Sequence, residues 1–226
     1  MYIYSYKVNF EVYDNNLLKY LTKLLTKSKK KEVERFAFVE DKIRAIFSEI
    51  LLNYVVKKHY GLSLQKITIK KNRQGKKFFL NFPYIKFNIS HSGNWIVLAI
   101  GVQEVGVDIQ KKEKTCINSI INYLKEESFY TGLKEDQKKE MFYENWVIRE
   151  SFLKAIGTGF SIPSTLDEIN INRNDKLVSN KDWVYHYFLK NFERDYLFCL
   201  CSKEQISKLT IINVSKEELL PNSIKD

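Results

Sequence analysis

The amino-acid sequence predicts an α+β fold made of two halves of similar size. Residues 1–13 alternate between apolar and polar side chains, as a strand does, and residues 38–58 carry apolar side chains at helical spacing. Strands and helices in the first part are followed by helices and strands in the second, with no low-complexity linker between them. We therefore expect two closely packed halves, residues 1–104 and residues 105–226.

Helices are expected to follow the first strand. Leucines at positions 17, 18, 21, 24 and 25 form a helical stripe in residues 15–27, and the basic run KSKKKEVERF continues as a helix. The strongest helix, in residues 38–58, ends at Gly61, a residue typical of helix C-termini. Three short strands complete this half, and they cover KITIKK, residues 85–90 and residues 94–102.

The second half begins with the strand VGVDIQ. Helices are expected near residues 115–125 and 135–155, because apolar side chains recur there at helical spacing. The pattern then returns to strands, which we expect near residues 167–172, 183–190 and 194–201, with KLTIINV as a last one.

Composition limits the classes of function. The chain has 37 Lys and Arg against 27 Asp and Glu, a net charge of +10, and 44% hydrophobic residues, which argues against disorder. A basic protein favours anionic partners, and charge alone does not choose among nucleic acid, anionic lipid, phosphorylated small molecules and acidic proteins. Cys116, Cys199 and Cys201 lack metal-binding spacing and are expected to be structural thiols in a reducing cytosol.

No segment of the sequence looks like a membrane or export signal. The N-terminus lacks a basic region followed by an apolar run, and the longest apolar stretch, WIVLAIGV, is too short to span a bilayer. We therefore expect a cytoplasmic protein without a membrane partner.

The strand VGVDIQ places an acid and an amide on one face. Gly106, Asp108 and Gln110 point together because alternate residues of a strand share a face. Oxygen atoms from Asp108 and Gln110 suit a hard cation such as Mg²⁺, and Gly106 leaves room for something to approach. A half-exposed strand with a polar face explains the same pattern, and the motif taken alone favours that simpler interpretation.

The stretch NWVIRESFLK places a carboxylate near an apolar helix face. Phe142, Trp146 and Leu153 form a helical stripe, and Glu150 lies on or beside it. A carboxylate there is costly unless it is paired or bound to a metal. Lys154, four residues later, reaches the same ligand. The alternative is a surface Glu–Lys pair, and Trp146 argues against it.

The stretch FNISHSG suits a phosphate group. His91 lies at a strand end between Ser90 and another serine, so imidazole, hydroxyl and backbone N–H groups occur together. A serine hydrolase is not indicated, because the sequence shows neither an acid partner for a triad nor a Gly-x-Ser-x-Gly elbow.

These three stretches, in this order and spacing, resemble the Sfp-type 4′-phosphopantetheinyl transferases over roughly residues 30–163. The segment WVIRESFLKAIGTG is similar to the family's tryptophan–Lys/Arg–Glu–Ser–Phe–x–Lys signature, with Arg149 in the basic position. The resemblance implies two similar α+β halves packed as a pseudo-two-fold monomer, with the active site between them.

The resemblance also implies the reaction. Such enzymes use Mg²⁺ or Mn²⁺ and move the phosphopantetheine arm of coenzyme A to a serine of an apo acyl, peptidyl or aryl carrier protein. Adenosine 3′,5′-bisphosphate is the other product. An acidic carrier would suit the basic surface, and the pathway, whether fatty acid, polyketide or nonribosomal peptide, is left open.

Site residues follow from the same resemblance. Asp108 and Glu150 hold the metal ion with Gln110 near it, and Lys154 contacts the phosphates together with Asp108 and its ion. Five further residues are expected to bind the phosphates of coenzyme A: Lys29, Arg44, Lys76, Ser90 and His91.

Two departures from the family pattern matter. The family often has glutamate where this chain has the neutral Gln110. It also places a general-base glutamate in the helix after GVDI, and counting along YLKEESFY reaches Ser128, with Glu126 and Glu127 just before it. We take Glu127 as the expected base, with Glu126 or a metal-bound water as the alternatives.

Three other classes compete with this interpretation. A basic nucleic-acid-binding module accounts for the charge, but it leaves Asp108 and Glu150 unexplained and no nucleic-acid motif is present. A non-catalytic carrier-binding relative has no need of the Asp108, Glu150 and Lys154 set. The chain length and WVIRES favour the longer monomeric enzymes over the short trimeric holo-acyl-carrier synthases.

Overall fold

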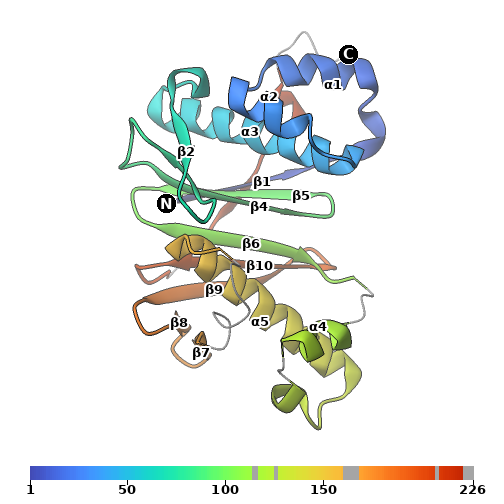
Figure 1. The fold of residues 1–226 in the computed structure, drawn as a ribbon, viewed down its shortest axis with the longest axis vertical. Coiled ribbons are helices and arrows are strands. Elements are labelled where there is room, and N and C mark those ends of the chain that lie inside the picture. The colour runs from blue at the N-terminus through green and yellow to red at the C-terminus, as the bar shows by residue number, and fades with distance from the viewer. Residues whose placement is uncertain (114–116, 125–126, 160–167, 207–208, 221–226) are drawn as a thin grey trace.

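Two large sheets lie between two groups of helices (Figure 1). A computed structural model describes five stretches of the chain: residues 1–113, 117–124, 127–159, 168–206 and 209–220. Each half combines one sheet with helices on its outer face, so the predicted α+β fold with two halves is confirmed.

The first half is covered by three helices. These are α1 (Asn15–Lys23), α2 (Lys27–Val33) and α3 (Val39–Tyr60). The sheet beneath them has the order β11-β1-β5-β4, and β11 runs parallel to β1 while the other pairs are antiparallel. Its strands are β1 (Tyr2–Lys7), β4 (Lys86–Ser92), β5 (Trp95–Gly101) and β11 (Ile211–Asn213). A separate hairpin consists of β2 (Ile69–Lys71) and β3 (Lys77–Phe79).

The second half is an antiparallel sheet with the order β6-β10-β9-β8-β7. Its strands are β6 (Val105–Lys111), β7 (Asn170–Asn172), β8 (Leu177–Ser179), β9 (Val184–Phe192) and β10 (Tyr196–Ser202). The helices α4 (Ile117–Tyr123) and α5 (Glu135–Ile156) complete it, and α5 packs on β6 and β10.

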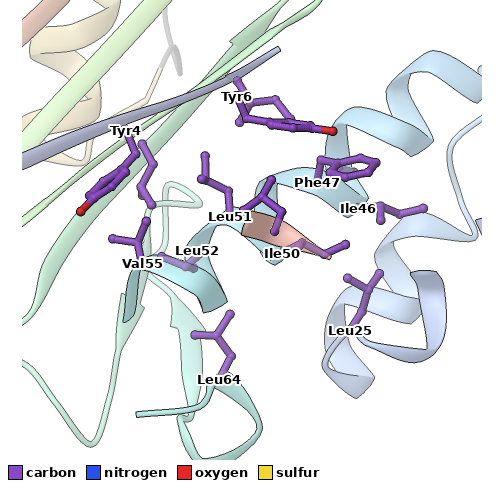
Figure 2. Packing of buried hydrophobic residues seen from close by; sticks show 14 of the residues in the cluster. Tyr4, Tyr6, Leu25, Ile46, Phe47, Ile50, Leu51, Leu52, Val55 and Leu64 are labelled. Atoms are coloured by element: carbon purple, nitrogen blue, oxygen red, sulfur yellow. The ribbon is translucent and has the colours of Figure 1, made fainter. Parts of the chain in front are cut away.

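Helix α3 is held on the first sheet by a large aromatic and aliphatic core. Phe47 stacks on Tyr6 of β1 with ring centroids 4.9 Å apart, and Figure 2 shows both rings beside the aliphatic side chains of α3. The side chains of Asp14 and Thr26 accept hydrogen bonds from the first turns of α1 and α2, which fixes where those helices begin.

The inner faces of the two sheets pack against each other. Trp95 and Val97 of β5 share one apolar cluster with Val107 of β6 and Phe198 of β10. The chain then returns to the first half, because β11 joins β1 and α7 (Lys216–Leu219) joins the core of α3. The division into residues 1–104 and 105–226 stays a prediction. Strand β11, near the end of the chain, belongs to the sheet of the first half.

Three short elements differ from the sequence-based expectation. The first strand ends at Lys7 rather than residue 13, because the Asn9 side chain accepts from the Glu11 N–H and begins a 3₁₀ helix. Strands β3 and β8 were not expected, since three residues are too few to show alternation.

None of the described helices is long and apolar enough to cross a membrane. Cys199 and Cys201 are buried free thiols on β10, and Cys116 lies outside the described residues.

Candidate active site

Helix α5 lies directly on strand β6 because Gly106 has no side chain. A Cβ atom at Gly106 would collide with the carbonyl oxygen of Ser151 and the backbone nitrogen of Ala155. The sequence predicted room for an approaching group at Gly106, and that group is the backbone of α5 itself. This close packing brings Glu150 and Lys154 of α5 beside Asp108 of β6.

Three elements meet at the carboxylate of Asp108. Lys154 Nζ donates to Asp108 Oδ1 at 2.6 Å and to Ser90 Oγ at 3.0 Å. Ser90 Oγ, on β4, donates to the same Oδ1 at 2.7 Å. The Asp108 side chain is 6% exposed, so its charge is compensated by these two partners rather than by water.

The second oxygen of Asp108 lacks a partner. Oδ2 is buried without any hydrogen bond, although Oδ1 receives two. Burial raises the pKa of nearby Glu150 to about 7, the charge of Lys154 opposes this shift, and the charge of Asp108 adds to it. No hydrogen bond to the Glu150 carboxylate occurs among the described residues. Such carboxylate oxygens suit a hard divalent cation.

Gln110 lies two residues beyond Asp108 on the same face of β6. The described part of the chain contains no group of three or more His, Cys, Asp and Glu placed to hold a metal. The donors here are two carboxylates and an amide, and they fit a cation that prefers oxygen ligands and keeps some of its water.

A cavity of about 510 Å³ lies beside this cluster. It is bounded by α2, α3, the β2–β3 hairpin, β4 and the end of α5. Four of the predicted site residues line it: Lys29, Lys76, His91 and Lys154. The sequence placed these residues in different elements, and the cavity is where they come together.

The basic end of the cavity is organised around Glu32. Lys29, Lys77 and Lys71 direct their ammonium groups at its carboxylate, at 2.7, 3.1 and 3.7 Å. Burial alone would raise the pKa of Glu32, but the hydrogen bonds and charges of Lys29 and Lys77 outweigh it and lower the pKa to about 2. Three cations around one anion leave excess positive charge for a phosphorylated ligand.

His91 opens into the cavity as a neutral ring. Burial, followed by the charges of Arg44, Lys154 and Lys29, lowers its pKa to about 4. His91 is surrounded by protein atoms on its other sides, but it is accessible to solvent where it lines the cavity. Arg44 lies close by and donates to the Gly93 carbonyl oxygen at 3.1 Å, which holds the turn between β4 and β5.

Lys76 connects the two halves at the end of α5. Its Nζ donates to the Ala155 carbonyl oxygen at 2.6 Å and to Glu104 at 2.5 Å. Asn72, in the same hairpin turn, donates to the Gly157 carbonyl oxygen at 2.8 Å. The hairpin therefore satisfies carbonyl groups that the helix end leaves free. A contact of Lys76 with phosphate stays a prediction.

The predicted base makes no hydrogen bond or ion pair to the cluster among the described residues. Glu127 begins the 3₁₀ helix Glu127–Tyr130 and is exposed. Within the described residues, no hydrogen bond or ion pair joins its carboxylate to Asp108, Glu150 or Lys154. Glu126, the alternative, lies outside the described residues.

Three residues that line the cavity were not expected from the sequence: Glu32, Lys71 and Lys77. The signal was present in KITIKKNRQGKKFF, where lysines flank a turn marked by Asn72 and Gly75. A hairpin with lysines on both arms presents them together, whereas the acid that gathers them comes from α2 and is not evident from spacing.

Comparisons with known proteins agree with the motifs. The family profile described as 4′-phosphopantetheinyl transferase, N-terminal, matches residues 14–103, and that of the 4′-phosphopantetheinyl transferase superfamily matches residues 104–211. A 4′-phosphopantetheinyl transferase of Bacillus subtilis is 32% identical over 77% of this chain and 80% of its own length. The 4′-phosphopantetheinyl transferase Sfp of Bacillus subtilis (strain 168) is 27% identical over 87% and 90%.

A relative from another organism also has phosphopantetheinyl transferase in its name. The L-aminoadipate-semialdehyde dehydrogenase-phosphopantetheinyl transferase of Homo sapiens is 29% identical over 69% of this chain and 60% of its own length. Two family profiles match in succession, and the relatives align over most of the chain. This chain therefore belongs to the 4′-phosphopantetheinyl transferase superfamily and is an enzyme of that class.

Proposed function

We propose that this enzyme transfers the 4′-phosphopantetheine arm of coenzyme A to a serine of an apo carrier protein. The observation that carries the proposal is the meeting of Asp108, Glu150 and Lys154 beside a basic cavity. The serine oxygen bonds to the phosphorus that bears the pantetheine arm, and the bond from that phosphorus to the bridging oxygen breaks. The products are the holo carrier and adenosine 3′,5′-bisphosphate.

A divalent ion, Mg²⁺ or Mn²⁺, fits the cluster. Asp108 through its unpartnered Oδ2 and Glu150 would hold it, with Gln110 nearby as a neutral oxygen donor. Bound there, the ion would supply positive charge against the pyrophosphate, a contribution of several kcal/mol in such sites.

The chain's own cations bind and orient the coenzyme. Lys154 is held by Asp108 and Ser90 while it lines the cavity, so its charge stays in place as the bisphosphate leaves. Lys29 and Lys76 line the same cavity, and Arg44 lies beside His91. Such fixed charges stabilise the anion without reorganisation during the reaction.

A carboxylate outside the cluster takes the proton of the carrier serine. Glu127 is our first candidate, and a positioned base is worth roughly 10²–10⁴-fold in rate. We expect Glu127→Gln to lose about that much in kcat and Glu126→Gln to keep its rate, as measured by holo-carrier formation. Full rates in both variants would remove this pair from the reaction.

The carrier is expected to be acidic and the enzyme monomeric. A net charge of +10 steers an acidic partner mainly through the association rate, which falls as salt rises. Association measured at several salt concentrations therefore separates a steered carrier from one recognised by apolar contacts.

The deciding experiment is incubation with coenzyme A, Mg²⁺ and a panel of apo acyl, peptidyl and aryl carriers, followed by intact mass. The carrier should gain the mass of phosphopantetheine, and chelation should stop the gain. Asp108→Asn and Glu150→Gln should nearly abolish turnover, whereas Gln110→Glu should keep it and tighten Mg²⁺ binding.

Two further outcomes would redirect the proposal. Binding of carrier without any mass gain across the panel would indicate a non-catalytic relative. Preference for an oligonucleotide over coenzyme A at physiological salt would indicate a nucleic-acid-binding protein instead.

A further inference from the structure

Strand β4 presents different side chains on its two faces. Successive side chains of a strand point in opposite directions, so His91 and Ser90 face opposite sides. His91 faces the cavity on the α3 side, while Ser90 faces β6 and is not among the described residues that line the cavity.

Side chains of β4 satisfy the free edge of β6. One edge of β6 pairs with β10, and its other edge donates backbone N–H groups to alternate side chains of β4. The bonds are Val107 N to Asn88 Oδ1 at 2.8 Å, Ile109 N to Ser90 Oγ at 3.4 Å and Lys111 N to Ser92 Oγ at 3.0 Å. This polar seam joins the two halves along the site.

The hydroxyl of Ser90 has no hydrogen-bonding capacity left. A hydroxyl group donates once and accepts twice. Ser90 Oγ donates to Asp108 Oδ1, and it accepts from Lys154 Nζ and from the Ile109 N–H. A phosphate oxygen needs a donor, and the single hydrogen of Ser90 is already directed at a buried carboxylate.

We propose that Ser90 is a positioning residue for the metal-binding carboxylate, and that its hydroxyl is not a ligand of coenzyme A. Together with Lys154 it occupies Oδ1 of Asp108, which fixes the carboxylate plane and leaves Oδ2 for the divalent ion. Partners of this kind are typically worth about 10–100-fold in metal affinity. The inference rests on the proposed function, and it changes the expectation drawn from the sequence for this hydroxyl.

Three full-length variants test the inference. Ser90→Ala removes the bond to Asp108, Ser90→Thr keeps a hydroxyl, and Ser92→Ala removes one bond of the same seam without touching Asp108. Two affinities are measured for each: that of Mn²⁺, followed by electron paramagnetic resonance, and that of coenzyme A in the presence of a chelator. Thermal unfolding confirms that each variant is folded.

We expect Ser90→Ala to lose about 10–100-fold in Mn²⁺ affinity while its coenzyme A affinity in chelator changes less than about twofold. Ser92→Ala should keep the wild-type Mn²⁺ affinity, and Ser90→Thr should recover most of it. In steady-state kinetics, Ser90→Ala should raise the Mg²⁺ concentration that gives half-maximal rate and leave the KM for coenzyme A unchanged. The contrast between Ser90→Ala and Ser92→Ala decides the matter even where the threonine methyl does not fit.

The opposite result overturns the inference. Tenfold weaker coenzyme A binding in chelator, with unchanged Mn²⁺ affinity, makes the hydroxyl a phosphate ligand. Equal losses of Mn²⁺ affinity in Ser90→Ala and Ser92→Ala make the seam as a whole responsible. A wild-type protein that binds Mn²⁺ as expected but modifies no carrier defeats the proposed function and leaves the assignment of Ser90 standing.

Discussion

Both halves of the molecule pack a long helix on a sheet, but the two helices contact their sheets in different ways. Each has a 22-residue helix that ends at a left-handed glycine, Gly61 with φ 64° after α3 and Gly157 with φ 77° after α5. Large side chains such as Phe47 and Tyr6 fill the space between α3 and its sheet, whereas the backbone of α5 lies against β6 at Gly106. In the first half, the large side chains build a core with a cavity at its edge. In the second half, the contact between the backbones of α5 and β6 places polar groups within hydrogen-bond distance of each other.

The halves also differ in the surroundings of one carboxylate each. Glu32 in the first half is surrounded by lysines, and its pKa is lowered to about 2. Glu150 in the second half is buried near Asp108, and its pKa is raised to about 7. The first carboxylate gathers lysines around it, and the second fits the divalent ion of the proposed function.

The largest loss of stability is expected when a side chain is introduced at Gly106. Gly106→Ala should cost about 3 kcal/mol or more in the free energy of unfolding, because the helix backbone must move away. The matched change in the other sheet, Gly101→Ala, meets its nearest atom at 3.4 Å and should stay within about 0.5 kcal/mol. Urea unfolding measures both, and similar costs would mean that backbone contact does not distinguish the halves.

Removing the charge of Glu150 should stabilise the metal-free protein at high pH. The folded pKa of about 7 exceeds the ordinary 4.5, so the free energy of unfolding falls as pH rises from about 4.5 to about 7. Glu150→Gln should lack this decline and exceed the wild type in stability at pH 8 with chelator present. Added Mg²⁺ should then stabilise the wild type and not the variant. Parallel pH profiles for the two proteins would contradict the raised pKa.

Glu32→Gln should behave in the opposite sense. The folded pKa of about 2 lies below the ordinary 4.5, so the stabilisation is present above about pH 4.5 and is lost as pH falls toward 2. The variant should be less stable than the wild type at pH 7, and the difference should vanish in acid. Thermal unfolding across this range tests it, and a constant difference at all pH values would exclude the ion pairs as its source.

The smallest loss of stability is expected from replacing Lys76, which joins the two halves. Lys76→Met should cost about 1–3 kcal/mol, because it removes the donor to the Ala155 carbonyl oxygen and leaves Glu104 with Lys86 as its remaining ion-pair partner among the described residues. Hydrogen exchange should rise in the last turn of α5. The control Lys71→Met removes a 55% exposed lysine of the same hairpin and should cost less than about 1 kcal/mol. Equal exchange in both variants would show that Lys76 does not hold the helix end.

Much of the fold was readable from local patterns. Apolar spacing located both long helices, and alternation in VGVDIQ correctly put Gly106, Asp108 and Gln110 on one face of a strand. The three motifs also pointed to the family, because each is a short run whose residue types are tied to one chemistry. The sequence by itself therefore determined the two long helices and the strand that carries Asp108, together with the side of that strand that carries polar groups.

Only the tertiary structure decided which of these groups meet. Lys154 reaches Asp108 and Ser90 across separations of 46 and 64 residues, and no spacing rule encodes such a pair. The sequence pattern indicated open space at Gly106, but it did not show that helix α5 fills this space. It also showed a hydroxyl group at Ser90, but not that this hydroxyl donates to Asp108. The physical reason is that periodicity specifies the direction of a side chain, whereas its partner depends on how sheets and helices pack together.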